Sequence, residues 1–350
     1  MTKPAWLIGA AVDAEPLVAT RGWLVDQEGP RLLAGLAALR TRLGGRAVLA
    51  VAGAARAKVL AAAAPEGVEV RDIGDGFPLD DAAELAWEVA GVAVRPGQSV
   101  ADAGVVVVRA AELAAGPGRP LTVTGAVARP YVARVKPDAT VEALVEHAGG
   151  ALGEAWVALA GGPMRGALVE RELPLPPEAE ALIVLPADHA VVRARKLPLG
   201  DQVRRALGAC EGCGLCTAAC PPAQRGWPVS PQAALRALTL PSTSTSTSTS
   251  TSTSRSTRTG IDHSGHEARA VESAALCTHC GLCDLVCPAG LSPAGLLDGY
   301  RAALAGDAAA AARALATPMS APIDAARRLS RGLLTLRLGL SGYASAAALG

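Results

Sequence analysis

The residues of this chain with the clearest chemistry are its cysteines, which fall into two copies of one spacing. Each copy reads C-x2-C-x2-C-x3-C and is followed directly by a proline. The first copy is Cys210, Cys213, Cys216 and Cys220, and the second is Cys277, Cys280, Cys283 and Cys287. This spacing is typical of segments that bind a [4Fe–4S] cluster through cysteine thiolates. A fully ligated cluster has no open iron, which favours one-electron transfer over Lewis-acid catalysis.

The fourth cysteine of each copy is predicted to complete the cluster of the other copy. Three cysteines on one tight loop can hold three irons of a cubane, but the fourth corner points away from that loop. In two-cluster ferredoxins this corner is filled from the other segment. The predicted ligand sets are Cys210, Cys213, Cys216 and Cys287 for cluster 1, and Cys277, Cys280, Cys283 and Cys220 for cluster 2.

Zinc and disulfide bonds are weaker interpretations of the same cysteines. Structural zinc sites usually use pairs of C-x2-C arms with four ligands per ion, so the third cysteine of each copy would be surplus. Disulfide frameworks suit small secreted domains, whereas this chain has 350 residues and we expect no signal peptide. Iron–sulfur ligation therefore explains the pattern best.

The overall composition limits the classes of partner. The formal net charge is +1 and aromatic residues make up 3% of the chain, so neither a basic patch nor base-stacking platforms are expected for nucleic acid. No stretch approaches the ~18–20 apolar residues of a membrane span. We therefore expect a cytoplasmic protein, in a reducing compartment that suits cluster cysteines.

Residues 1–115 are predicted to form an α/β layered domain. Short apolar runs indicate strands, leucines and alanines at helical spacing indicate helices, and the Asp80-Asp81 pair indicates the start of a helix. The expected strands are 5–11, 47–52, 68–73 and 104–108, and the expected helices are 31–43, 54–64 and 80–89. This alternation predicts a partly parallel sheet.

A small α+β module is predicted over residues 116–172, followed by a proline-rich linker over 173–199. The module combines short apolar runs with one helix, which Thr140 is expected to cap. Its expected strands are 121–127, 131–136 and 155–160, and its expected helix is 138–150.

Residues 200–305 are predicted to form a mainly helical cluster domain that holds both cysteine segments. A strict Ser-Thr alternation at 242–254 has no apolar face to bury and is predicted to be disordered. Helices at 231–240 and 267–276 are expected to bring the two cysteine segments together. The remaining residues, 306–350, are predicted to be a helical tail. Arginines among leucines give this tail a basic amphipathic character (Arg327, Arg328, Arg331 and Arg337). Two interpretations of this basic face stand open: packing of the helix on its own domain, and contact with a partner or membrane surface.

The order of these parts resembles the RnfC/PduS-like family. The resemblance is carried by four stretches: Leu121–Val127, Gly161–Gly166 (GGPMRG), Cys216–Pro221 and Cys287–Pro293. It implies a domain similar to part of the flavin subunit of complex I, an SLBB-type β-grasp domain and a two-cluster ferredoxin domain. It covers most of the chain.

The resemblance also implies FMN on the α/β domain, often with NADH as the other redox partner. The glycine-rich loop that cradles the flavin phosphate should precede the first strand, and this sequence begins at that strand. Ala10 and Val108 stand where asparagines would be expected, so no phosphate-binding nest is visible. Asp13-Ala14-Glu15-Pro16 is similar to the family's acidic turn, and Glu15 is the candidate on the flavin side. No catalytic residue is predicted.

The sequence thus predicts an electron-transfer protein with two [4Fe–4S] clusters that passes single electrons between a flavin or reduced carrier and a partner protein. Membership of an NADH- or flavin-linked oxidoreductase, of the cobalamin-reductase or Rnf type, is left open, as is FMN binding. The expected partners are redox proteins, including subunits of a membrane-associated or microcompartment complex. Two alternatives remain: a β-grasp module that binds a corrinoid, and a scaffold subunit without flavin.

Overall fold

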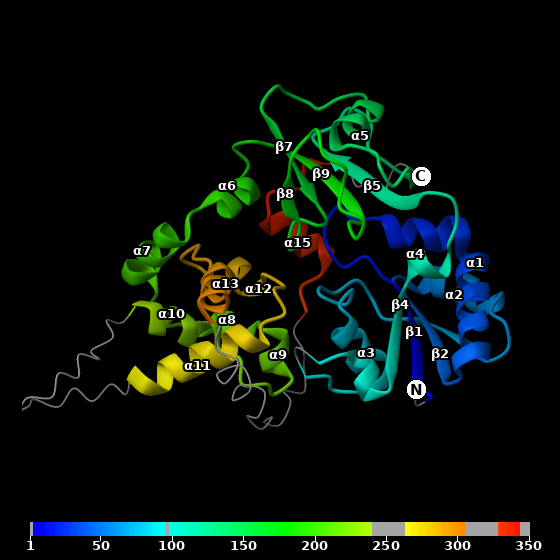
Figure 1. The fold of residues 1–350 in the computed structure, drawn as a ribbon, viewed down its shortest axis with the longest axis horizontal. Helices are drawn as coiled ribbons and strands as arrows, with labels where there is room; N and C mark the ends of the chain where they lie inside the picture. The colour runs from blue at the N-terminus through cyan, green and yellow to red at the C-terminus, as the bar shows by residue number, and fades with distance from the viewer. Residues whose placement is uncertain (1–2, 96–97, 240–262, 305–327, 344–350) are drawn as a thin grey trace, which may run out of the picture. The chain divides into compact units, whose positions relative to one another are not determined.

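The computed structural model of the chain describes residues 3–95, 98–239, 263–304 and 328–343. The chain divides into two compact units, one formed by Met1–Lys196 with Arg327–Gly350 and the other by Leu197–Ala326. The first unit contains two β-sheets, and the regular elements described in the second are helices (Figure 1). This mixed architecture confirms the predicted multidomain fold class. The Ser-Thr tract at 242–254 and most of the predicted tail lie outside the described residues.

A four-stranded parallel sheet with strand order β3-β2-β1-β4 forms the centre of the N-terminal domain. Its strands are β1 (Trp6–Ala11), β2 (Arg46–Val51), β3 (Val68–Asp72) and β4 (Val105–Arg109). The inner strands β1 and β2 are continuous apolar runs and are buried almost throughout. Such runs are typical of parallel sheets that helices cover on both faces.

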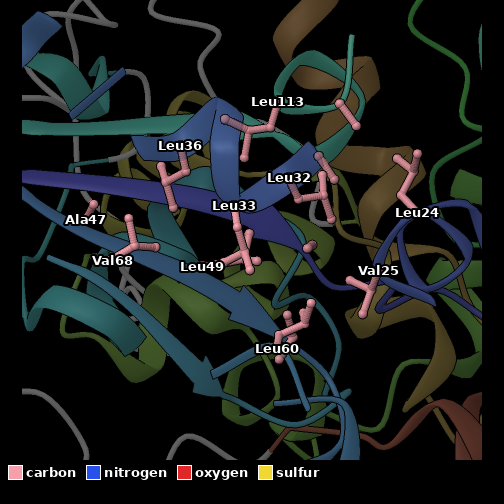
Figure 2. Packing of buried hydrophobic residues seen from close by; sticks show 14 of the residues in the cluster. Leu24, Val25, Leu32, Leu33, Leu36, Ala47, Leu49, Leu60, Val68 and Leu113 are labelled. Atoms are coloured by element: carbon pink, nitrogen blue, oxygen red, sulfur yellow. The ribbon is translucent and has the colours of Figure 1, made fainter. Parts of the chain in front are cut away.

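Helices cover the two faces of this sheet and divide its side chains between two cores. Leu7 packs with residues of α1 (Thr20–Leu43), whereas its neighbour Ile8 packs with residues of α3 (Ala82–Ala90). Figure 2 shows α1 leucines beside Leu49 and Leu113 in the first core. The remaining elements of this domain are α2 (Ala54–Ala62), a 3-10 helix (Val100–Ala103) and α4 (Ala110–Leu113).

A second, five-stranded sheet has the order β6-β5-β9-β7-β8. Its strands are β5 (Arg119–Gly125), β6 (Tyr131–Val135), β7 (Trp156–Ala160), β8 (Ala167–Val169) and β9 (Ala181–Pro186). Helix α5 (Val141–His147) begins after Thr140, whose hydroxyl accepts a hydrogen bond from the Ala143 amide as predicted.

The predicted linker at 173–199 is wrong, because the central strand of this sheet comes from it. Strand β9 pairs in parallel with β5 and antiparallel with β7, and α6 (Ala190–Lys196) follows. The prolines of this segment favoured a linker, but Ala181–Leu185 is a continuous apolar run in which every residue is buried. Such a run is typical of a strand covered on both faces.

The described part of the tail belongs to the first unit. Helix α15 (Arg331–Arg337) begins after Ser330, whose hydroxyl accepts a hydrogen bond from the Leu333 amide. Leu334 and Leu340 are fully buried, and Leu340 packs with residues of the second sheet. The helix covers only a short part of the predicted helical tail of 306–350, and residues 305–327 lie outside the described range.

The second unit is built from α7 to α13. These helices are α7 (Leu199–Ala209), α8 (Leu215–Ala218), α9 (Pro221–Gln224), α10 (Pro231–Thr239), α11 (His263–Leu276), α12 (Leu282–Leu285) and α13 (Pro293–Leu304). Ala234, Ala270 and Ala274 form a buried cluster with Leu297, so small side chains join α10, α11 and α13. Among the helices in the described part of the chain, none is long and apolar enough to cross a bilayer.

Candidate metal centre

The two cysteine segments follow the same backbone course. Gly214 and Gly281 have φ angles of 76° and 75°, and each immediately precedes a short helix, α8 or α12, that carries the third cysteine of its segment. Two residues earlier, Gly212 and His279 also have positive φ values. Left-handed backbone is easily reached by glycine, which lets each loop turn tightly around its first three cysteines.

Cys210, Cys213 and Cys216 line one cavity together with Cys287 from the other segment. The cavity has a volume of about 140 Å³. Gly212, Gly214, Ala209 and Ala289 form part of its wall, and the rest is Glu211, Gln232, Leu235, Pro288 and Leu291. The structure therefore brings together the four side chains predicted for cluster 1. Small residues there let backbone amides approach a bound group closely.

The remaining four cysteines, Cys220, Cys277, Cys280 and Cys283, lie close to one another and are more deeply buried than the first group. Burial raises the pKa of the Cys220 thiol well above its ordinary value, and the neighbouring thiols Cys280 and Cys277 raise it further. The pKa of Cys283 is also raised well above its usual range by burial, and the charges of Asp284, Cys280 and Cys220 act in the same direction. Cys220 thus lies near Cys280 and Cys277 of the other segment, with which it is predicted to share cluster 2.

A thiol with a raised pKa becomes a thiolate at neutral pH only when a bound metal stabilises the negative charge. Cysteine binds metals as thiolate, and a buried thiolate without a partner is strongly unfavourable. Iron would supply the compensating charge, so burial of these cysteines couples deprotonation to cluster binding. The donor set, its burial and the cavity all fit a thiolate-ligated cluster.

Hydrogen bonds fix the second loop around Cys277. The His279 amide donates to Cys277 Sγ at 3.4 Å, and Arg301 donates to the Cys277 carbonyl at 2.8 Å. The His279 ring pairs with Asp298 instead of with sulfur. The hydrogen bond from His279 to sulfur therefore comes from its backbone, and backbone donors of this kind tune cluster potentials.

The two loops differ most in exposure. Cys213 is exposed and Leu215 is 48% exposed, whereas their equivalents Cys280 and Leu282 are 7% and 2% exposed. The edge of the first loop is therefore exposed, and the corresponding edge of the second loop is buried.

Glu15, the flavin-side candidate, lies in the first unit in a buried contact with the GGPMRG loop. Its carboxylate accepts hydrogen bonds from the Met164 amide at 2.7 Å and from Arg165 Nε at 2.9 Å, and Arg165 also pairs with Asp80. A side chain at Gly162 would collide with the Glu15 carboxylate, which accounts for a glycine there. Burial raises the pKa of Glu15, although Arg165 opposes the shift.

Sequence reasoning missed Arg165 as the partner of Glu15, and Asp80 as the second partner of Arg165. The pairs are separated by 150 and 85 positions, so no local pattern connects them. The one available signal was the position of Arg165 inside the GGPMRG stretch.

Comparison with known proteins agrees with this geometry. The family model described as 4Fe-4S dicluster domain matches residues 209–292, and the model described as SLBB domain matches residues 120–168. The chain is 29% identical over 303 residues to the cobalamin reductase PduS of Salmonella typhimurium, and 28% identical to that of Citrobacter freundii. Each alignment covers 82% of this chain and 62% of the relative, so the chain spans less than two thirds of the relatives' length.

Two solved structures of an NAD+-reducing [NiFe]-hydrogenase also match. The air-oxidized form is 16% identical, with a TM-score of 0.47, and the match covers 97% of this chain and 60% of that one. The H2-reduced form is 17% identical, with a TM-score of 0.45, and the match covers 86% and 55%. The family models and curated relatives confirm the predicted resemblance. The chain is an iron–sulfur protein of the electron-transfer type, with a 4Fe–4S dicluster domain and an SLBB domain, similar over most of its length to the PduS cobalamin reductases.

Proposed function

We propose that the chain carries two [4Fe–4S] clusters whose fourth ligands are exchanged between the two cysteine segments. Cluster 1 is assigned to Cys210, Cys213, Cys216 and Cys287, and cluster 2 to Cys277, Cys280, Cys283 and Cys220. The observation that carries the proposal is the cavity that Cys287 shares with the three cysteines of the first segment.

Bound clusters supply one-electron redox chemistry, and the surrounding residues determine how electrons reach them. Cys280 and Leu282 are buried in the second loop and would shield one side of cluster 2 from water, and the His279 amide would stabilise charge on the Cys277 sulfur. The outward edge at Cys213 and Leu215 makes cluster 1 the proposed point of exchange with a partner protein. A resident FMN is not part of this route, because the arginine beside Glu15 is already paired with carboxylates.

The names of the curated relatives favour a corrinoid as the final electron acceptor. We propose cobalamin reduction as the activity of the complete system, with the partner protein belonging to a membrane-associated or microcompartment complex. Direct corrinoid binding by the second sheet is the alternative. Equilibrium binding of cobalamin to the full chain separates the two, since direct binding is expected only for the alternative.

The central test is anaerobic purification followed by iron and acid-labile sulfide analysis. Two cubanes predict roughly eight irons and eight sulfides per chain. Reduction should produce the electron paramagnetic resonance signals of reduced [4Fe–4S] clusters. Zinc without sulfide would contradict the proposal, and a chain without bound metal would favour the scaffold alternative.

A further inference from the structure

A ligand-sized cavity of about 390 Å³ opens at the carboxyl ends of strands β1 and β4 in the first unit. Residues 12–15, which follow β1, and Arg109, which ends β4, contribute to its wall. The carboxyl edge of a parallel sheet is the usual place for ligands in open α/β folds. The volume lies in the range of small-molecule sites. By resemblance, this edge of the sheet is where FMN would be expected.

The charges around the cavity oppose a phosphate group. Its walls contain more carboxylates than arginines, the acids being Asp13, Glu15, Asp80, Glu178 and Glu180 and the bases Arg21, Arg109 and Arg165. Each arginine is paired: Arg21 with Glu180 at 2.7 Å, Arg109 with Glu112 at 2.7 Å and Arg165 with Glu15 at 2.9 Å. A phosphate entering here would meet more carboxylates than arginines in the wall, and the arginines of the wall are already paired; Arg331, which acts on Asp13 from outside the wall, adds one positive charge.

The backbone donors that could replace those arginines are also occupied. Helix α1 begins beside the cavity, and a helix N-terminus is the usual place for a phosphate in α/β folds. Here the Asp13 carboxylate accepts hydrogen bonds from the amides of Arg21 at 3.0 Å and Gly22 at 2.6 Å. Asp13 is 5% exposed. The protein's own carboxylate thus takes the position that a phosphate would need.

The second sheet leaves open space in the cavity for an uncharged ligand. It contributes only small side chains, Ala160, Ala167 and Ala181, which leave room for a ring.

We propose that this cavity excludes phosphate and accepts an uncharged ligand, so that it binds riboflavin more tightly than FMN. The residues present therefore do not fit the FMN that the resemblance implies. The proposal is independent of the cluster assignment, since it concerns a cavity in the first unit and a binding measurement.

Riboflavin and FMN differ only in the phosphate, which makes them matched probes. The full chain is titrated with each flavin, and binding is measured from the quenching of flavin fluorescence. The Kd for FMN should be at least about tenfold higher than the Kd for riboflavin. The difference should shrink at high salt, because screening weakens the repulsion. An FMN affinity equal to or above that of riboflavin overturns the proposal, and so does failure of riboflavin to bind.

Two variants test the cause of the selectivity. Glu178→Gln removes one exposed carboxylate at the cavity and should narrow the gap between the two flavins by about threefold. Glu172→Gln removes an exposed carboxylate outside the cavity and should leave the gap unchanged. Equal effects of both variants would refute a role for cavity charge. Asp13→Asn, checked for folding by circular dichroism, should narrow the gap further.

Discussion

Pairs of cysteine variants can test whether the two segments exchange their fourth ligands. Cys287 lines the cavity of Cys210, while Cys277 lies with Cys220. On this assignment, the double variant Cys210→Ala/Cys287→Ala removes two ligands from cluster 1 alone. The double variant Cys277→Ala/Cys287→Ala removes one ligand from each cluster. Since a cubane holds four irons, the first variant should retain about four irons per chain and the second close to none.

The assay is iron and sulfide content after anaerobic purification, with electron paramagnetic resonance of the reduced protein. The first double variant should show the signal of one cluster, without magnetic interaction between two. Leu215→Ala serves as a control, because this side chain is 48% exposed and leaves all the cysteines in place. The opposite result, in which the Cys210/Cys287 pair loses both clusters and the Cys277/Cys287 pair retains one, would refute the exchange. Each cluster would then be held within a single segment.

Three further predictions concern the first unit. Gly162→Ala should lower the free energy of unfolding by about 1–3 kcal/mol in urea titration, because the new methyl group would push Glu15 out of its hydrogen bonds. Leu340→Ala should lower the free energy of unfolding by about 2–5 kcal/mol, since this side chain is fully buried. Leu336→Ala, at a 67% exposed position, should change the free energy of unfolding by less than about 0.5 kcal/mol. Equal effects of the two variants would contradict the packing of Leu340. Burial raises the pKa of Tyr131 to about 12, so the folded state keeps a proton that the unfolded state loses near pH 10, and stability should fall as pH rises from 10 to 12. Tyr131→Phe should make that fall shallower, and an unchanged slope would show that another group is responsible.

The cysteine arrangement could be predicted from sequence because cluster binding imposes a spacing that few other functions need. The difference in exposure between the two loops could not, since both share the same pattern. Leu215 and Leu282 occupy equivalent positions, yet one is exposed and the other buried. Only the packing around each loop distinguishes them.

Local patterns predicted most strands of the first unit and failed where two signals conflicted. Prolines near Ala181–Leu185 suggested a linker, but the apolar run between them forms the centre of a sheet. Helix α1 begins at Thr20, well before the predicted start at 31, and continues through Pro30. Proline lacks an amide donor and disrupts the helix nearby, and Glu28 indeed has non-helical backbone angles. The sequence therefore predicted that the helix starts after Pro30, whereas in the structure one helix passes through Pro30 with a kink at Glu28.

The return of residues 328–343 to the first unit has a consequence for the order of folding. Leu340 completes a core whose other buried members come from β7, β9, α6 and the segment Leu17–Val18, so this core closes only after residue 340 has been synthesised. Both cysteine segments, which precede it in sequence, are made before then. Domains commonly fold as they emerge during synthesis. Here the cluster-binding unit leaves the ribosome while the first unit is still incomplete, so cluster insertion can precede the final closure of its neighbour.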